Sequence, residues 1–277
     1  MTRALVSIDS GSGPPVVLLH GQPGSGASWD PVTRMLESEC RVLAPDRIGY
    51  GDSPEEALGL AENAEVVAEF IRDRRASPAT VVAHSWSGGV AVLLAGRHPT
   101  LVRSLVLVGA ACTPDSLNFL DQWLNIPGVG DVLTVAGLVG IGEVLPRLRP
   151  FTRYVPPRFR DQLDTALPDR SVAGAESGTW RQQKRTFMRE QRAIVEELPA
   201  VEAALGGLDL PVAVVSGTWD LVVPPRAAVT LARAVRGAEL YLLPRIGHFV
   251  ARDSPQALVE VIRKSVRSAS VADVEKD

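Results

Sequence analysis

Short apolar runs alternate with amphipathic stretches at both ends of this 277-residue chain, and this alternation limits the folds that it can adopt. Apolar runs bounded by turn residues are typical of buried strands, whereas apolar residues three and four apart are typical of helices. We therefore expect strands at Ala4–Ile8, Pro15–Leu19, Arg41–Ala44, Thr80–Val82, Val102–Val108, Val212–Ser216 and Glu239–Leu243. Helices are expected at Ser28–Glu39, Glu62–Arg75, Val90–Ala95, Arg226–Val235 and Gln256–Val266. This order predicts an α/β fold, with a mostly parallel, doubly wound sheet.

The alternation stops after Thr113 and resumes near Leu208, with only helical patterns and Pro/Gly breaks between them. We therefore expect residues 1–112 and 209–277 to form one α/β core, and residues 113–208 to form an inserted helical cap. Such an insertion lies over the carboxyl edge of the sheet, where open parallel sheets bind ligands.

The segment TVVAHSWSGG, Thr80–Gly89, joins an apolar strand to a helix through a turn with a serine at its tip. This is the layout of a nucleophile elbow. The turn needs small residues two before and two after the serine, and Ala83 and Ser87 hold those places around Ser85. We favour Ser85 because it directly ends the strand. Ser87 is the competing nucleophile, and a helix cap is the plainer interpretation of Ser85.

A serine hydroxyl is a poor nucleophile at neutral pH and needs an adjacent base, for which histidine is suited. The chain has four histidines. His20 is expected to brace its loop, His84 to point away from the serine, and His98 to be solvated at a helix end. His248 follows a strand end, which places it at the same edge as Ser85, so we predict it as the base.

The base must be oriented by an acid. Asp220 also follows a strand end and is the predicted acid, although a turn aspartate that binds backbone donors is its plainer interpretation. Asp115, after the strand Val102–Val108, is the fallback. Asp46 and Asp52 are expected to hold their own loop together.

Five motifs in order resemble those of the α/β-hydrolase superfamily, in its serine-hydrolase branch with a helical lid. They are HGQPG at His20–Gly24, DRIGYGDS at Asp46–Ser53, the elbow AHSWSGG, SGTWD at Ser216–Asp220 and IGH at Ile246–His248. The resemblance covers about residues 16–266 and is weakest across the cap. Two departures stand out: only one clear strand precedes the first motif, and the elbow has Ser87 where glycine is usual.

The resemblance implies a triad of Ser85, Asp220 and His248, because the acid follows the serine and precedes the histidine in family order. It also implies an oxyanion hole made by the backbone N–H groups of Gln22 and Trp86. The expected activity is hydrolysis of an ester or related acyl bond through an acyl-enzyme, without metal or cofactor. Epoxide hydrolases and haloalkane dehalogenases are disfavoured, because those relatives carry Asp where this chain has Ser85.

Two other functions remain open at this point. The same triad could hydrolyse a carbon–carbon bond, perform perhydrolysis or transfer an acyl group, because fold and triad do not separate these reactions. A non-catalytic receptor that binds a ligand under the cap is the third hypothesis.

The candidate pocket residues are aromatic. Trp219 adjoins the predicted acid, and Phe119 and Trp123 lie in the first expected cap helix. Trp86 is a further candidate pocket wall. The charged run Gln182–Arg192 is interpreted as the solvated face of a helix.

The composition is that of a soluble globular chain with a formal net charge of −3. No concentrated Lys/Arg stripe is present, so no nucleic-acid partner is expected. No secretory signal or membrane span is expected either, which favours a cytoplasmic protein that acts on a small, apolar acyl substrate. Cys40 and Cys112 show no metal or redox spacing and are expected to be reduced core thiols. The sequence makes no prediction of the oligomeric state.

Overall fold

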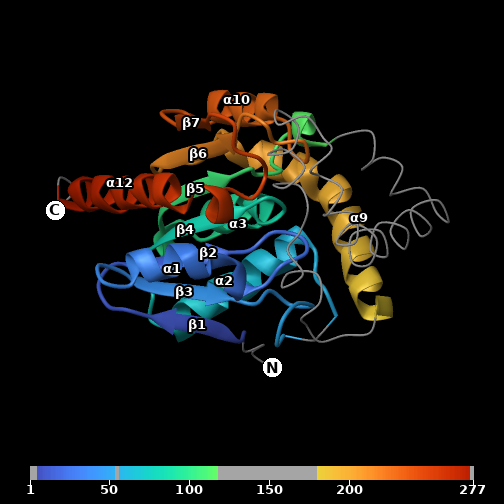
Figure 1. Ribbon diagram of the computed structural model, residues 1–277, viewed down its shortest axis with the longest axis horizontal. Helices are drawn as coiled ribbons and strands as arrows, with labels where there is room; N and C mark the ends of the chain where they lie inside the picture. The colour runs from blue at the N-terminus through green and yellow to red at the C-terminus, as the bar shows by residue number, and fades with distance from the viewer. Residues whose placement is uncertain (1–4, 54–55, 118–179, 275–277) are drawn as a thin grey trace, which may run out of the picture.

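Figure 1 shows the computed structural model, which describes residues 5–53, 56–117 and 180–274. One seven-stranded sheet runs through the molecule in the order β1-β3-β2-β4-β5-β6-β7. Only the edge strand β1 is antiparallel to its neighbour, and the other pairs are parallel. The strands are β1 (Ser7–Ser10), β2 (Pro15–Leu19), β3 (Arg41–Pro45), β4 (Ala79–His84), β5 (Val102–Val108), β6 (Val212–Gly217) and β7 (Glu239–Leu243). The expected α/β fold is confirmed.

Helices cover both faces of this sheet (Figure 1). One face packs against α1 (Asp30–Leu36), α11 (Val250–Asp253) and α12 (Pro255–Val274). The other face packs against α2 (Leu60–Asp73), α3 (Ser87–Arg97), α9 (Trp180–Leu205) and α10 (Pro225–Ala234). Single 3-10 turns occur at Gly26–Trp29, Pro99–Leu101 and Pro114–Ser116.

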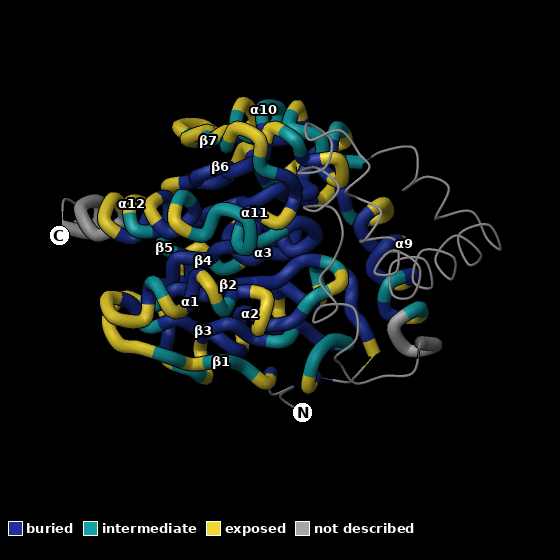
Figure 2. The backbone as a smooth tube through the Cα atoms, in the orientation of Figure 1, coloured by how far each residue is buried: buried dark blue, intermediate teal, exposed yellow. Residues whose placement is uncertain are grey.

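The strand β2 illustrates why the apolar runs are continuous. Val16 and Leu18 belong to the core on the α12 side, and Val17 and Leu19 belong to the core on the α2 side. Side chains alternate between the two faces of a strand, so a strand covered on both faces needs apolar residues at every position. Figure 2 shows the result as a buried centre, with exposed residues in loops, at the edges of the sheet and on helices such as α10 and α12.

Several expected boundaries differ from the structure. The first strand is Ser7–Ser10, because β1 pairs with β3 through the register Ser7↔Pro45. Together with the expected β2, β1 gives two described strands before His20, where only one was clear from the sequence. The expected helix Ser28–Glu39 is divided into a 3-10 turn and the shorter α1. At edges and turns, backbone pairing rather than apolar content sets where an element ends.

Within the expected cap, the structure describes the 3-10 turn Pro114–Ser116 and the long helix α9, which packs along α2 and α3. Because β5 and β6 are neighbours in the sheet, the chain between them is an insertion between adjacent strands. The boundaries 113–208 stay a prediction. Among the described helices, none is both long enough and apolar enough to span a bilayer.

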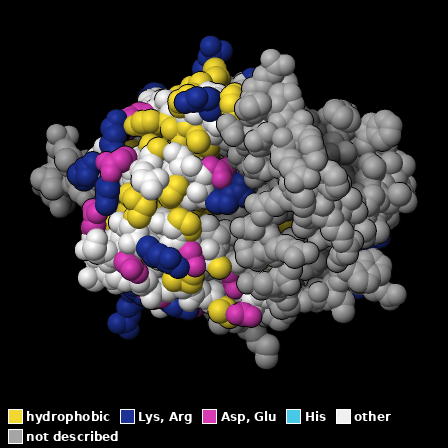
Figure 3. Space-filling model, viewed as in Figure 1, with side chains coloured by type: hydrophobic (Ala, Val, Ile, Leu, Met, Phe, Trp, Pro, Cys, Tyr) yellow, Lys and Arg dark blue, Asp and Glu magenta, His cyan; other side chains and the backbone are white. Residues whose placement is uncertain are grey.

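Charge is mixed on the surface. On the face seen in Figure 3, acidic and basic side chains lie interspersed over the described core, often as neighbours. Among the described residues, surface ion pairs include Arg263–Glu39 and Lys264–Glu239.

Candidate active site

The strand β4 ends at His84 and the helix α3 begins at Ser87, so Ser85 lies in a turn of only two residues. Ser85 has φ of +56°, in the left-handed region that L-residues rarely adopt. Its backbone N–H donates to the Val108 carbonyl at the end of β5 (2.9 Å), which anchors the turn to the sheet. A strained serine between a strand and a helix is the geometry of a nucleophile elbow.

The backbone also separates the two candidate serines. Ser87 is the first residue of α3, is fully buried, and donates its hydroxyl to the His20 carbonyl. Ser85 has the left-handed backbone of the turn's tip, and its hydroxyl has no hydrogen-bond partner among the described residues. The geometry therefore favours Ser85 over Ser87.

The carboxylate of Asp220 divides its two oxygens between two tasks. Oδ2 lies 2.7 Å from His248 Nδ1, and Oδ1 accepts the N–H groups of Val222 (2.9 Å) and Val223 (2.8 Å). Asp220 is 3% exposed and His248 is 7% exposed, so the pair is shielded from water. Asp220 therefore contacts the predicted base and also binds backbone donors of its turn, so the two interpretations are compatible. The turn N–H groups orient the carboxylate toward the His248 ring.

The fallback acid Asp115 is engaged elsewhere. Its Oδ2 accepts the hydroxyl of Thr230 in α10 (2.6 Å), and no contact with His248 is found within the described residues. The structure brings Asp220, rather than Asp115, to the histidine.

Ser85, Asp220 and His248 follow three strands that end at one edge of the sheet, β4, β6 and β7. Gly109 follows the intervening strand β5, and a Cβ there would lie 3.2 Å from both Asp220 Oδ2 and His248 Nδ1. Gly109 directly follows Val108, which holds the Ser85 N–H. Within the described residues, no hydrogen bond joins the Ser85 hydroxyl to the His248 ring.

The side chain of His84 contacts the predicted base, His248, which was not expected from the sequence. Its Nε2 donates to the His248 carbonyl (3.0 Å), and the centroids of the two rings are 4.6 Å apart. Burial, together with the neighbouring His248, lowers the pKa of His84 to about 3. His84 is therefore a neutral donor that ties the loop of His248 to the end of β4.

The expected oxyanion loop lies directly against Ser85. A Cβ at Gly21 would lie 3.1 Å from Ser85 Cβ and 2.8 Å from His84 Nδ1, so glycine is needed for this approach. Within the described residues, the backbone N–H groups of Gln22 and Trp86 have no hydrogen-bond partner. Both are thus available to an oxyanion at this edge.

The side chain of Gln22 donates to the Phe187 carbonyl in α9 (2.8 Å). The indole N–H of Trp86 donates to the Glu190 carbonyl in the same helix (3.0 Å), and Trp86 is almost fully buried. The side chain of Trp86 is therefore held against α9, and its place in a pocket wall stays a prediction.

An ion pair between Arg47 and Glu190 lies inside the molecule beside the oxyanion loop, with both side chains fully buried. The Tyr50 hydroxyl donates to Glu190 Oε2 (2.6 Å), and the guanidinium of Arg47 stacks on Trp86 at 4.5 Å from the ring centroid. Burial raises the pKa of Glu190, although Arg47 counteracts this.

The interpretation of Gln182–Arg192 as a solvated face is wrong in part. The segment is helical, but Thr186, Glu190 and Gln191 are buried. Glu190 is buried because Arg47 compensates its charge, and periodicity within the helix carries no sign of that partner.

Of the candidate pocket residues, Trp219 is half-buried next to Asp220, and its backbone N–H donates to the Ile246 carbonyl (2.9 Å). Phe119 and Trp123 lie outside the described residues. In the part of the chain that is described, no group of three His, Cys, Asp or Glu side chains could hold a metal ion.

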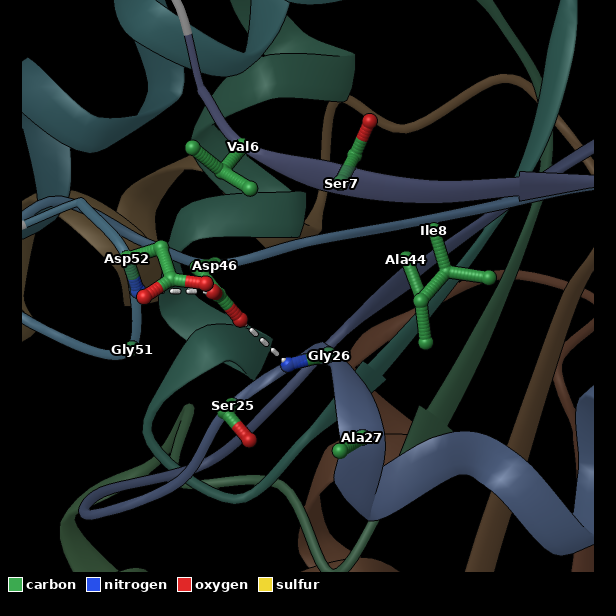
Figure 4. A pocket seen from close by; sticks show the side chains of 10 residues that line it. All are labelled: Val6, Ser7, Ile8, Ser25, Gly26, Ala27, Ala44, Asp46, Gly51 and Asp52. Carbon is green, nitrogen blue, oxygen red and sulfur yellow. Dashed lines mark hydrogen bonds between the residues drawn. The ribbon is translucent and has the colours of Figure 1, made fainter. Parts of the chain in front are cut away.

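A cavity of about 240 Å³ lies beside β1, away from the Asp220–His248 pair (Figure 4). Asp46 Oδ1 accepts the Gly26 N–H (2.7 Å), and Oδ2 accepts the Asp52 N–H (2.9 Å). Both bonds are drawn in Figure 4. Asp46 thus holds its loop together, as expected.

Comparison with known proteins gives one family. The model of the alpha/beta hydrolase family matches residues 16–261. A 2-hydroxymuconate semialdehyde hydrolase from a Pseudomonas species is 27% identical, over 96% of this chain and 91% of that protein. A haloalkane dehalogenase from Mycobacterium marinum is 30% identical, over 92% and 86%. The solved structure of a thermophilic esterase from Thermogutta terrifontis superposes with a TM-score of 0.73 at 21% identity, covering 96% of this chain and 93% of that one.

Proposed function

The chain belongs to the alpha/beta hydrolase family, and we propose that it is a serine hydrolase that cleaves an ester or related acyl bond through an acyl-enzyme. The observation that supports this most directly is the pairing of a strained serine at the elbow with a buried Asp220–His248 pair at the same sheet edge. The substrate is a small molecule with an apolar acyl group.

In this mechanism Ser85 Oγ attacks the acyl carbon while its proton passes to His248 Nε2. Asp220 holds Nδ1–H and stabilises the imidazolium that forms. The N–H groups of Gln22 and Trp86 donate to the oxyanion of the tetrahedral intermediate. His248 then gives the proton to the leaving group, and a water molecule, activated by the same ring, hydrolyses the acyl-enzyme.

The likeness to a 2-hydroxymuconate semialdehyde hydrolase favours a second candidate, in which the same triad hydrolyses a carbon–carbon bond. A comparison of nitrophenyl esters with vinylogous diketones on the same enzyme separates the two. The better substrate by kcat/KM identifies the reaction.

The 30% identity to a haloalkane dehalogenase does not extend to that chemistry in our proposal. Displacement of a halide forms an alkyl-enzyme ester that water must cleave, which requires a carboxylate nucleophile. This chain has the hydroxyl of Ser85 at the elbow.

The proposal is tested with a fluorophosphonate probe and short nitrophenyl esters. Wild type should be labelled once and turn over steadily, and Ser85→Ala should lose both properties. Ser87→Ala is the matched control, because it removes a neighbouring hydroxyl and should keep labelling. Labelling that persists in Ser85→Ala refutes the nucleophile, and a single slow turnover with tight ligand retention would favour the receptor hypothesis.

We further propose a cytoplasmic location, without a nucleic-acid partner. Cys40 and Cys112 are both free and buried, as expected for reduced core thiols.

A further inference from the structure

Arg47 donates to two carbonyls of the expected oxyanion loop, those of His20 and Gly21. Its Nε donates to the His20 carbonyl (3.1 Å), and its Nη2 donates to the Gly21 carbonyl (2.9 Å). Its third nitrogen, Nη1, pairs with Glu190. Only a planar guanidinium offers donors along three directions in one rigid group.

His20 strengthens the same contact. The backbone N–H of Arg47 donates to His20 Nε2 (3.0 Å), so the proton of the neutral ring is on Nδ1, and Nδ1 donates to the Gly21 carbonyl (2.8 Å). Burial and the nearby Arg47 keep the pKa of His20 well below its ordinary value, which preserves this tautomer. The Gly21 carbonyl therefore accepts two hydrogen bonds from buried groups.

The Gly21 carbonyl belongs to the same peptide unit as the N–H of Gln22, the proposed oxyanion donor. This peptide is trans, so its C=O and N–H point in opposite directions. Holding the carbonyl toward Arg47 aims the N–H away from Arg47. Two hydrogen bonds to the carbonyl also polarise the peptide unit and make its N–H a better donor.

Helix α9 supplies the other half of the arrangement. It provides the Glu190 carboxylate that compensates Arg47, the Phe187 carbonyl that binds the Gln22 side chain, and the Glu190 carbonyl that binds the Trp86 indole. Both residues with proposed oxyanion N–H groups are thus attached to one cap helix.

We propose that Arg47 is a positioning residue of the oxyanion hole, held by Glu190, so that the hole is assembled only when α9 is docked on the core. This inference rests on the proposed serine-hydrolase function. Arg47 and Glu190 act through the peptide unit between Gly21 and Gln22 and do not touch the substrate.

A purely structural role makes a different prediction. Desolvating two charges is costly, and a buried ion pair replaced by apolar residues of similar size is often neutral or stabilising. If the pair served only to fill the space between α9 and the core, the double substitution Arg47→Met/Glu190→Met would keep both the fold and the activity.

The test measures kcat and KM on a nitrophenyl ester, the inhibition constant of a phenylboronic acid, and Tm. Because boronic acids form a tetrahedral adduct on serine, their affinity reports the oxyanion hole. We expect the double variant to keep its Tm, to lose kcat by about 10- to 100-fold with little change in KM, and to bind the boronic acid more weakly by a similar factor. Unchanged kcat and boronic acid affinity would overturn the inference.

A second variant covers the case in which the double variant does not fold. Arg47→Lys keeps the buried positive charge but lacks the fork that reaches both loop carbonyls. It should show the same loss of kcat, again with little change in KM, and wild-type kcat in folded Arg47→Lys would overturn the inference. Arg189→Gln is the matched control. Arg189 also lies in α9, and the substitution removes its exposed ion pairs with Glu56 and Glu62, so kcat should be unchanged.

The two levels of proposal fail differently. If wild type shows no Ser85-dependent turnover, the proposed function is wrong and this inference falls with it. If wild type turns over and the Arg47 variants match it, only the positioning role is wrong.

Discussion

Replacing Ser85 by glycine should make the protein more stable than replacing it by alanine, although both variants lose the nucleophile. Ser85 has φ of +56°, and a left-handed backbone costs an L-residue about 1–2 kcal/mol that glycine does not incur. Alanine and serine carry the same Cβ, so Ser85→Ala retains this cost. The two variants thus differ in backbone strain while both lack the hydroxyl.

Part of the gain is offset in the unfolded chain, where glycine is more flexible than alanine by about 0.4–1 kcal/mol. We therefore expect Ser85→Gly to exceed Ser85→Ala by about 0.5–1 kcal/mol in free energy of unfolding. For a chain of this size, that difference corresponds to about 1–3 °C in Tm. Urea denaturation followed by circular dichroism measures it directly.

Arg75 offers a matched control outside the site. It has φ of +51° in the turn that follows α2 and is exposed, so Arg75→Gly should exceed Arg75→Ala by a similar amount without loss of activity. If the glycine variant is more stable at position 75 but not at position 85, the elbow stores no backbone strain and our assignment of the turn is wrong.

Three further predictions concern the same edge of the sheet. Asp220→Asn should lower kcat by about 10⁴-fold yet keep most of the wild-type Tm, because the amide oxygen still accepts the turn N–H groups. Asp220→Ala should lower both kcat and Tm, and equal Tm for the two variants would contradict this. Gly21→Ala should slow fluorophosphonate labelling by up to about 100-fold, because its Cβ would lie 3.1 Å from Ser85 Cβ, and an unchanged labelling rate would count against the proposed loop position. The free energy of unfolding should fall as the pH drops from 7 to 5, because burial lowers the pKa of His84 and His20 in the folded protein. Below about pH 6.5 the unfolded chain therefore binds protons that the folded chain does not. The limiting slope is about 1.4 kcal/mol per pH unit for each histidine. Urea titrations at pH 7, 6 and 5 measure the slope, which His84→Gln should reduce.

The attachment of α9 to the oxyanion loop has a consequence for specificity. Open parallel sheets bind ligands at the carboxyl ends of their strands, and we propose that a substrate bound there also contacts α9, the element that supports Arg47. A substrate that displaces α9 would disturb the donors of the oxyanion hole. Cap packing and catalytic rate are therefore coupled in our proposal, rather than independent properties.

The succession of strands and helices along the chain and the candidate triad could be predicted from the sequence because both depend on local patterns. Apolar runs such as Pro15–Leu19 report burial on two faces whatever their partners are. Each of Ser85, Asp220 and His248 follows a strand end, and parallel strands end at a common edge. Position relative to a strand, together with the family order of the motifs, placed these distant residues in one candidate site, although Asp115 met the first criterion as well.

Only the tertiary structure shows how the two candidate serines differ: Ser85 has φ of +56° at the tip of the turn, whereas Ser87 begins α3 and donates its hydroxyl to the His20 carbonyl. It also placed His84 against His248 and buried Glu190 within a run of charged residues. The charge of Glu190 is tolerated in the interior because Arg47, 143 positions away in the chain, compensates it. Local patterns report how much apolar surface a segment must bury, but the partner of a buried charge is set by which distant segments the fold brings together.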